Sequence, residues 1–305
     1  MMKTDIRSIT KKDAGGLFPQ LPERANKGMM GRLLVICGSY DPVGLSMSGA
    51  AYFCAKAAYR CGAGIVEIFT HRSNYPALAG LVPEAVFSLY GADEEREAVS
   101  ARVAEAVKRS DAVVIGCGLG QSEMAVSILR TVLSVADQPL LIDADGLNIL
   151  SKSDSFWDLM GEEQKKRTVI TPHPGEMSRL CGFSVDEILA SPRTVAEAYA
   201  KERGVICLLK DHRTVITDGR ISYENHSGNP GMATAGMGDI LAGVIGALLA
   251  RAPKGDHDAI LLRTAAGAYL HGRAGDRAKK AVGEYSLIAS DLLSQIEVSI
   301  RKDFR

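Results

Sequence analysis

The chain has 305 residues, 46% of them hydrophobic, and its 36 Lys and Arg residues balance 36 Asp and Glu residues. A formally neutral chain without a basic cluster argues against nucleic acid or an anionic membrane surface as its main partner. The longest apolar run, residues 240–250, is too short for a membrane-spanning helix, which takes about 18 residues or more. The composition predicts a soluble globular protein.

Cysteine usage gives a second indication, about the compartment. The six cysteines are scattered without a C-x-x-C pair, and most stand in apolar surroundings. This pattern favours reduced core thiols over disulfides or metal ligands, and so predicts a reducing, cytoplasmic setting. The six are Cys37, Cys54, Cys61, Cys117, Cys181 and Cys207.

Short apolar strands alternate with helical segments along most of the chain. The expected strands are 32–37, 65–69, 112–115, 139–142, 168–171 and 205–210, and the expected helices are 47–59, 98–109, 123–136, 194–203 and 240–250. This alternation predicts βαβ units and a mostly parallel sheet with helices on both faces. Asp218-Gly219, between 214–217 and 220–223, predicts a hairpin. With no linker or repeat visible, we expect one α/β domain over residues 1–305.

The expected strands end in glycines and polar residues. These ends are Gly38-Ser39 and the segments 116–120, 143–146 and 172–176, together with Lys210. In open α/β sheets, ligands bind beyond the carboxyl ends of the strands. We therefore expect the functional site at this edge of the sheet.

The glycine-rich segment 229–239 leads into the apolar helix 240–250. Free N–H groups at a helix start, together with the helix dipole, favour a bound anion, and glycines allow close approach. Asp239 in this first turn could act as a general base beside a phosphate. The alternative is that Asp239 is a helix-start residue after a glycine turn. The chain contains no Walker A motif.

Two further segments leave alternatives open. Proline flanks His173 on both sides between a strand and a helix, which suits either a ligand contact or a structural histidine. Asp143, Asp145 and Asn148 suit contact with Mg²⁺ and phosphate, or an Asx turn before a helix. The other histidines show no metal-binding spacing such as H-E-x-x-H, and we expect them at the surface or in helix caps.

Together, these segments resemble the ADP-dependent NAD(P)H-hydrate dehydratase family, which has a ribokinase-like fold. The resemblance starts near Lys27 and covers most of the chain. It is carried, in the family's order, by segments 26–36, 48–64, 116–120, 143–147, 171–176 and 230–243.

The resemblance implies roles for particular residues. The substrate site would be lined by Ala50, Gly118, Gly120, His173 and Asp239. The adenine nucleotide would be bound by Lys210, Asp211, His212, Arg213, Thr214 and Gly238. The family usually has Lys-Gly where this chain has Lys210-Asp211, which favours contacts through the backbone at this turn. The implied cofactors are ADP or ATP with Mg²⁺, and no metal ligand is identified.

The implied reaction restores NAD(P)H from its hydrate, NADHX or NADPHX. Phosphorylation of the ring hydroxyl makes phosphate the leaving group, the ring nitrogen lone pair expels it, and ADP becomes AMP. Asp239 would remove the hydroxyl proton, and the amides of 236–238 would hold the transferred phosphoryl group. The rival functions are a small-molecule kinase of the same fold and a non-catalytic nucleotide-binding regulator, although a regulator would need no base.

The resemblance also bears on partners. Many relatives carry an N-terminal epimerase domain, and only about 30 residues precede the first strand expected here. We therefore expect the epimerase activity on a separate chain. The dehydratase itself is expected to form a homo-oligomer such as a tetramer.

Overall fold

The computed structural model describes residues 5–40, 44–253 and 255–303. In these residues, ten strands form one sheet in the order β1-β10-β9-β8-β7-β6-β5-β2-β3-β4. Only β9 runs antiparallel to its neighbours, β8 and β10. The predicted mostly parallel sheet and the predicted hairpin are therefore confirmed. The strands are β1 (Asp5–Ser8), β2 (Arg32–Ile36), β3 (Ile65–His71), β4 (Val86–Tyr90), β5 (Ala112–Ile115), β6 (Leu140–Ile142), β7 (Thr168–Ile170), β8 (Ile206–Leu209), β9 (Thr214–Thr217) and β10 (Ile221–Asn225).

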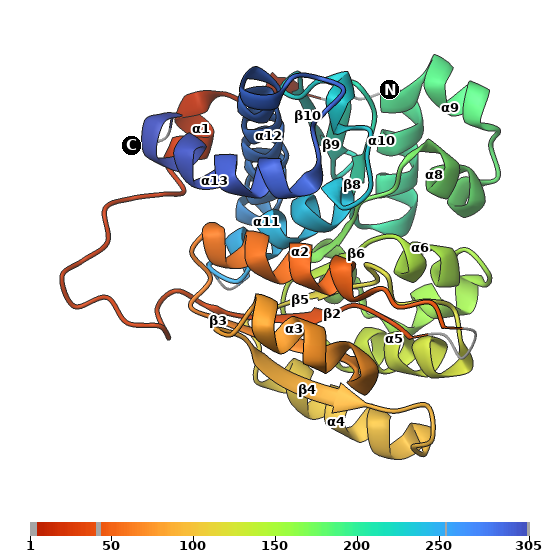
Figure 1. Ribbon diagram of the computed structural model, residues 1–305. Coiled ribbons are helices and arrows are strands. Elements are labelled where there is room, and N and C mark those ends of the chain that lie inside the picture. The colour runs from red at the N-terminus through yellow and green to blue at the C-terminus, as the bar shows by residue number, and fades with distance from the viewer. Residues whose placement is uncertain (1–4, 41–43, 254, 304–305) are drawn as a thin grey trace.

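Helices cover both faces of the sheet (Figure 1). One face packs against α2, α11, α12 and α13, and the other packs against α4, α5, α6 and α10. The helices are α1 (Lys11–Gly15), α2 (Ser48–Arg60), α3 (Tyr75–Leu81), α4 (Arg96–Lys108), α5 (Glu123–Val135), α6 (Asp145–Leu150), α7 (Glu162–Lys166), α8 (Pro174–Cys181), α9 (Val185–Ala190), α10 (Pro192–Arg203), α11 (Met237–Leu249), α12 (His257–Val282) and α13 (Ala289–Asp303).

The strands in the middle of the sheet are apolar on both sides because both of their faces are buried. On β2, Leu33 and Val35 belong to one core, and Leu34 and Ile36 belong to the other. All four are fully buried. Successive side chains of a strand point to opposite faces, so a continuous apolar run supplies both cores at once.

The expectation that the first strand lies at 32–37 is wrong, because β1 precedes it. Residues 5–8 pair in parallel with β10, from Asp5 opposite Ile221 to Ser8 opposite Glu224. The segment Asp-Ile-Arg-Ser has no apolar run, and Ile6 is exposed. This edge strand forms by pairing with β10, and its sequence has no hydrophobic pattern from which a strand could be predicted.

Close contact between α11 and α2 places the start of α11 at the carboxyl end of the sheet. A Cβ at Gly243 would overlap the carbonyl oxygen of Cys54, so the two backbones touch. Gly236, at the N-cap of α11, has φ +89°, and a Cβ there would lie 2.9 Å from the ring of Phe53. Both positions therefore require glycine. No helix in the described part of the chain is long and apolar enough to cross a membrane.

Candidate active site

A cavity of about 1060 Å³ lies at the carboxyl end of the sheet. The ends of β6, β7 and β8 contribute Asp143, His173 and Lys210 to its wall. The segment 227–239 and the middle of α12 enclose the rest. The site is thus at the edge predicted from the strand ends, and the cavity is large enough for a nucleotide.

Asp239 lies half-buried in the first turn of α11 and lines this cavity. Burial and the negative charge of Asp143 raise the pKa of Asp239 to about 6, against smaller opposing effects of Cys117 and Lys210. A carboxylate in this state is still mostly ionised at neutral pH, yet it accepts a proton more readily than an ordinary aspartate. The geometry suits a general base. The alternative role, a helix-start residue, explains why Asp239 stands in the first turn of α11 but not its raised pKa.

Lys210 is the cation of the site. Its Nζ donates to Asp143 Oδ1 at 2.8 Å and lies 3.7 Å from Glu176 Oε2. Burial disfavours the charge of Lys210, but Asp143 and Glu176 outweigh burial and raise the pKa of Lys210. The ammonium group is therefore held in its charged form beside the cavity, where it can neutralise phosphate oxygens.

The two aspartates of segment 143–148 do not act together. Asp145 begins α6, and its Oδ2 accepts a hydrogen bond from Gly120 N at 2.8 Å, away from the Asp143–Lys210 pair. Among the residues that the structure describes, no group of three or more His, Cys, Asp or Glu side chains could hold a metal ion. Mg²⁺ would thus fit this site only as a complex with phosphate oxygens, which is its usual mode in nucleotide sites.

His173 is both a structural residue and part of the cavity wall. Its Nδ1 accepts hydrogen bonds from the backbone N–H groups of Gly175 and Glu176, at 3.0 and 3.4 Å, and so caps α8. Burial lowers the pKa of His173, and nearby Lys210 and Arg179 add to this effect against Glu176. In the neutral ring, with Nδ1 accepting, the proton is on Nε2. This Nε2 lies 3.5 Å from Glu176 Oε1, so the N–H group of the ring faces that carboxylate.

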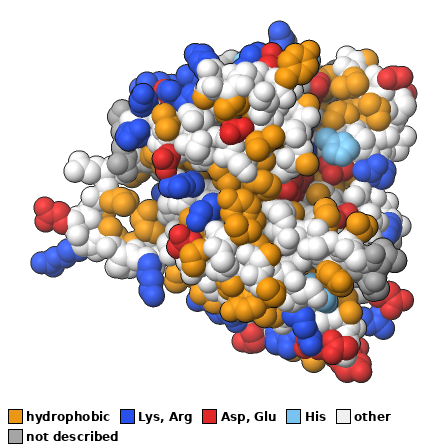
Figure 2. Space-filling view, in the orientation of Figure 1, with side chains coloured by type: hydrophobic (Ala, Val, Ile, Leu, Met, Phe, Trp, Pro, Cys, Tyr) orange, Lys and Arg blue, Asp and Glu red, His pale blue; other side chains and the backbone are white. Residues whose placement is uncertain are grey.

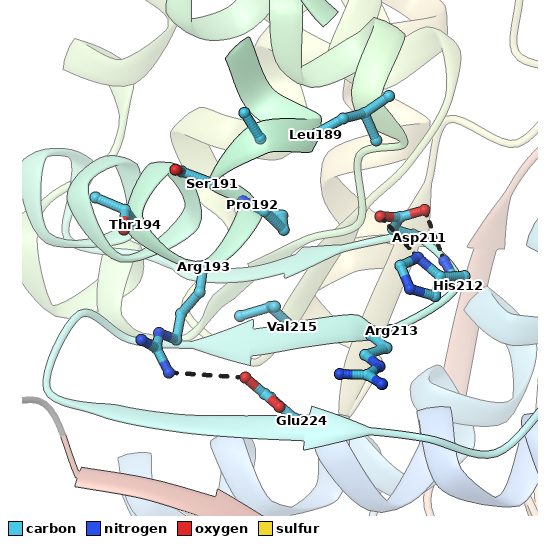
Figure 3. A pocket seen from close by; sticks show the side chains of 11 residues that line it. Leu189, Ser191, Pro192, Arg193, Thr194, Asp211, His212, Arg213, Val215 and Glu224 are labelled. Atoms are coloured by element: carbon cyan, nitrogen blue, oxygen red, sulfur yellow. Dashed lines mark hydrogen bonds and ion pairs between the residues drawn. The ribbon is translucent and has the colours of Figure 1, made fainter. Parts of the chain in front are cut away.

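The turn after β8 separates two cavities. Lys210, Asp211, His212 and Thr214 line the larger one, whereas Arg213 lines a second cavity of about 480 Å³ that also touches Asp211 and His212. Arg213 is thus separated from Lys210, Thr214 and Gly238, although it shares the second cavity with Asp211 and His212. The Asp211 carboxylate accepts a hydrogen bond from His212 N at 2.7 Å and lies 3.3 Å from His212 Nδ1. Figure 3 shows Asp211 and His212 side by side at one end of this second cavity, with Arg193 and Glu224 paired at the other.

Ala50, Gly118 and Gly120 form a neighbouring group outside the lining of the larger cavity. A Cβ at Gly118 would lie 3.0 Å from the Ala50 Cβ, and one at Gly120 would lie 3.2 Å from Ser39 Oγ. Ser39 N donates to Gly118 O at 2.6 Å. The loops after β2 and β5 are thereby joined to the start of α2, and Cys117 connects this group to Asp143.

His271 is the functional position that sequence reasoning missed. The expectation that it lies at the surface or in a cap is wrong, since it projects from the middle of α12 and lines the larger cavity. Burial lowers the pKa of His271 to about 4, so the ring is neutral. Its Nε2 donates to Met237 O at 3.0 Å and thus supports the first turn of α11. No local signal marks such a residue, because its partner is 34 positions away.

The fold and the site together define a class of protein. A mostly parallel sheet with helices on both faces and a glycine-rich helix start above the strand ends is ribokinase-like, and solved ribokinase-like proteins share this architecture. The family model described as NAD(P)H-hydrate dehydratase matches residues 33–298. This chain belongs to the NAD(P)H-hydrate dehydratase family.

Individual relatives agree with this assignment. The chain is 38% identical to the bifunctional NAD(P)H-hydrate repair enzyme of Coxiella burnetii, over 97% of this chain and 56% of that protein. It is 30% identical to the ADP-dependent (S)-NAD(P)H-hydrate dehydratase of Listeria monocytogenes, over 97% of both. The solved ADP/ATP-dependent NAD(P)H-hydrate dehydratase of Bacillus subtilis, co-crystallised with ATP and Mg²⁺, superposes with a TM-score of 0.79 at 26% identity, covering all of both chains. The chain spans about half the length of the bifunctional relatives it matches.

Proposed function

We propose that this protein catalyses the ADP-dependent dehydration of NADHX and NADPHX to NADH and NADPH, releasing AMP and phosphate. One observation carries the proposal beyond family membership. Asp239, with its raised pKa, stands in the first turn of α11 beside the Lys210 ammonium, at the wall of a cavity large enough for a nucleotide. A base next to a fixed cation is the arrangement that phosphoryl transfer to a hydroxyl group requires.

The nucleotide supplies a phosphoryl group, so the ring hydroxyl departs as phosphate instead of hydroxide. Asp239 takes the hydroxyl proton as the oxygen bonds to phosphorus. Lys210 and the N–H groups of 236–238 offset the charge that develops on the phosphoryl oxygens. The ring C–O bond then breaks with help from the ring nitrogen lone pair, and the adjacent carbon loses a proton to restore the double bond. Mg²⁺ would enter on the nucleotide phosphates and add to the same neutralisation.

Residue roles form part of the proposal. The hydrate would lie among Ala50, Gly118, Gly120, His173 and Asp239. The adenine nucleotide would lie against Lys210, Asp211, His212, Thr214 and Gly238. Arg213, an exposed cation of this turn, would contribute only at longer range.

The test is incubation of the purified protein with NADHX and ADP while the near-ultraviolet absorbance of NADH is followed. The proposal expects NADH and AMP to appear in equal amounts. A kinase that stops at phosphorylation would consume ADP without restoring absorbance, and a regulator would bind ADP without turnover. ATP in place of ADP, and omission of Mg²⁺, establish which donor and which metal dependence apply.

Self-association and compartment complete the proposal. Figure 2 shows hydrophobic side chains spread over the face that carries α2, α3 and β4, where Tyr75, Leu81 and Val86 are between 43% and 50% exposed. These groups support a homo-oligomer, such as a tetramer, whose mass would be measured by light scattering on protein eluting from a size-exclusion column.

The six free cysteines, five of them buried, support a reducing cytoplasmic setting.

A further inference from the structure

Three buried thiols lie together behind the candidate base. Cys37 follows β2, Cys117 follows β5, and Cys54 lies on α2. All three are inaccessible to solvent, and their proximity together with burial raises the pKa of each thiol well above its ordinary value. The sequence analysis assigned these residues to the core, and the proposed reaction uses none of them.

The outermost of these thiols contacts the charged groups of the site. Cys117 Sγ donates to Asp143 Oδ2 at 3.8 Å, while the other oxygen of that carboxylate accepts from Lys210. The same thiol lies near enough to Asp239 to lower the pKa of that carboxyl. Its single proton therefore faces Asp143, the carboxylate that Lys210 also binds, close to Asp239.

We propose that Cys117 is a positioning residue for the reaction proposed above: its S–H group donates into the Asp143–Asp239 pair and so allows both carboxylates to be ionised together. Two neighbouring carboxylates resist the second ionisation, because the second charge is repelled by the first. A hydrogen bond donated to the charged form lowers that cost. By opposing this repulsion, the thiol helps to keep Asp239 available as a base.

The groups around Asp239 are consistent with this role of the Cys117 thiol. The charged and titratable groups around Asp239 include the thiols Cys37, Cys54 and Cys117 and the Asp143–Lys210 pair, and the rings of His173 and His271 line the same cavity. Its hydrogen bond to Cys37, burial and the charge of Asp143 raise the pKa of Cys117 well above its ordinary value, so the thiol keeps its proton. Within this set, Cys117 and Lys210 are the groups that lower the pKa of Asp239.

The shape of the loop does not depend on the sulfur. Gly116 and Gly118, on either side of Cys117, have φ +120° and +59°, and Gly38 N donates to Cys117 O at 3.0 Å. These backbone features fix the loop after β5 whatever side chain stands at 117. Substitution of the thiol therefore tests its proton, with little change in the backbone.

The first experiment compares the pH dependence of kcat/KM in Cys117→Ala, Cys117→Ser and Cys207→Ala. Cys207 is equally buried, but in the core on the opposite face of the sheet, so it controls for the loss of a core thiol. We expect the acid limb to move upward by about 0.5 to 1 pH unit in Cys117→Ala, less than for an ordinary hydrogen bond to a charged group because a thiol is a weak donor. Cys117→Ser, which keeps a donor, should stay close to the parent, as should Cys207→Ala. An unmoved limb in Cys117→Ala, or an equal shift in Cys207→Ala, overturns the proposal.

The second experiment needs no turnover and separates this proposal from the proposed function. Carboxyl carbons of ¹³C-labelled aspartate are titrated by NMR in the substrate-free protein, and Asp239→Asn assigns the signal. The Asp239 pKa should rise in Cys117→Ala by the same amount as the kinetic limb. An unchanged value refutes the role of Cys117, even if the protein proves to be a kinase. If the alanine variant does not fold, Cys117→Val is the second variant without a donor.

Discussion

Burial and the neighbouring carboxylate of Asp143 both raise the pKa of Asp239. Replacing it with asparagine removes the proton acceptor but little contact area. We expect Asp239→Asn to lose about 10²- to 10⁴-fold in kcat, the usual contribution of a positioned base, while calorimetric affinity for ADP stays within a few fold. Asp186→Asn, in the first turn of the exposed helix α9, is the matched control. Turnover of Asp239→Asn within threefold of the parent would contradict the assignment.

The same side chain determines the expected pH dependence. A base works only when it is deprotonated, so activity should fall as the pH falls through about 6, the raised pKa of Asp239. Well below that pH, kcat/KM should drop about tenfold per unit. An acid limb near pH 4, the value for an ordinary aspartate, would contradict the raised pKa of Asp239.

Asp211 is the residue at which this chain departs from the family pattern. Its carboxylate hydrogen-bonds to the backbone N–H of His212 and pairs with that ring, and so is already satisfied within the turn. We expect Asp211→Gly to change the Kd for ADP by only a few fold. A gain of a hundredfold or more would mean that the carboxylate faces the phosphates and weakens the nucleotide site through repulsion.

Among the elements, α2 and α11 pack closely against each other, and α11 carries Asp239 in its first turn. A Cβ at Gly243 would meet the backbone carbonyl of Cys54, which cannot move independently of α2. We expect Gly243→Ala to lower the free energy of unfolding by about 1 to 3 kcal/mol, the usual cost of overpacking, in urea titrations. Gly49→Ala makes the same change on α2, where nothing lies within 4 Å, and should be neutral or slightly stabilising. Equal effects of both substitutions would contradict close packing as the cause.

The elements also show what a sequence can reveal. The strands from β2 to β8 that were predicted carry apolar runs buried on both faces, whereas β1 and α12 carry no such local signal. In α12, Gly267, Gly272 and Gly275 lower the intrinsic helix propensity, yet each faces a close neighbour: Ile245, Ser227 and Met232 respectively. Tertiary packing selects glycine at these positions, and local propensity cannot report it.

The position of the candidate site could be predicted because the carboxyl ends of parallel strands lie at one edge of the sheet. This rule predicted that Asp143, His173 and Lys210 lie at one edge of the sheet, and they line the same cavity as Asp239. It could not foresee that Lys210 pairs with Asp143 while Asp145 turns to Gly120, since those choices depend on side chains far apart in sequence. For the same reason, the distribution of the β8–β9 turn between two cavities was not visible.

At the scale of the whole molecule, His257 connects three distant segments. Its Nδ1 is 2.6 Å from Lys166 O at the end of α7, and its Nε2 is 3.1 Å from Asp218 Oδ2 in the β9–β10 turn. The charged ring donates to both. Hydrogen bonding to Asp218 raises the pKa of His257. Although burial opposes it, bonding to His257 and nearby N–H groups lowers the pKa of Asp218.

The pair should therefore stabilise the fold within a defined pH range. The His257 contribution is complete below about pH 6.5, the unfolded value, and is lost as the pH rises through the raised folded pKa. The Asp218 contribution is present above about pH 4 and is lost as the pH falls toward its lowered pKa. We expect His257→Gln to cost about 1 to 2 kcal/mol between pH 5 and 6.5, and clearly less near pH 9. His226→Gln, at an exposed ring, is the control, and a cost independent of pH would contradict the ion pair.

The pairing of β1 with β10 has a consequence for the order of events during synthesis. Residues 5–8 leave the ribosome before any other strand of the sheet, but the strand that receives them, 221–225, emerges more than 200 residues later. Until then the N-terminal segment has no partner in the sheet, while the strands from β2 to β8 can already assemble in order. The first strand of this sheet to be translated is thus the last to be placed in it, and the sheet gains its final edge strand only after β10 has been made.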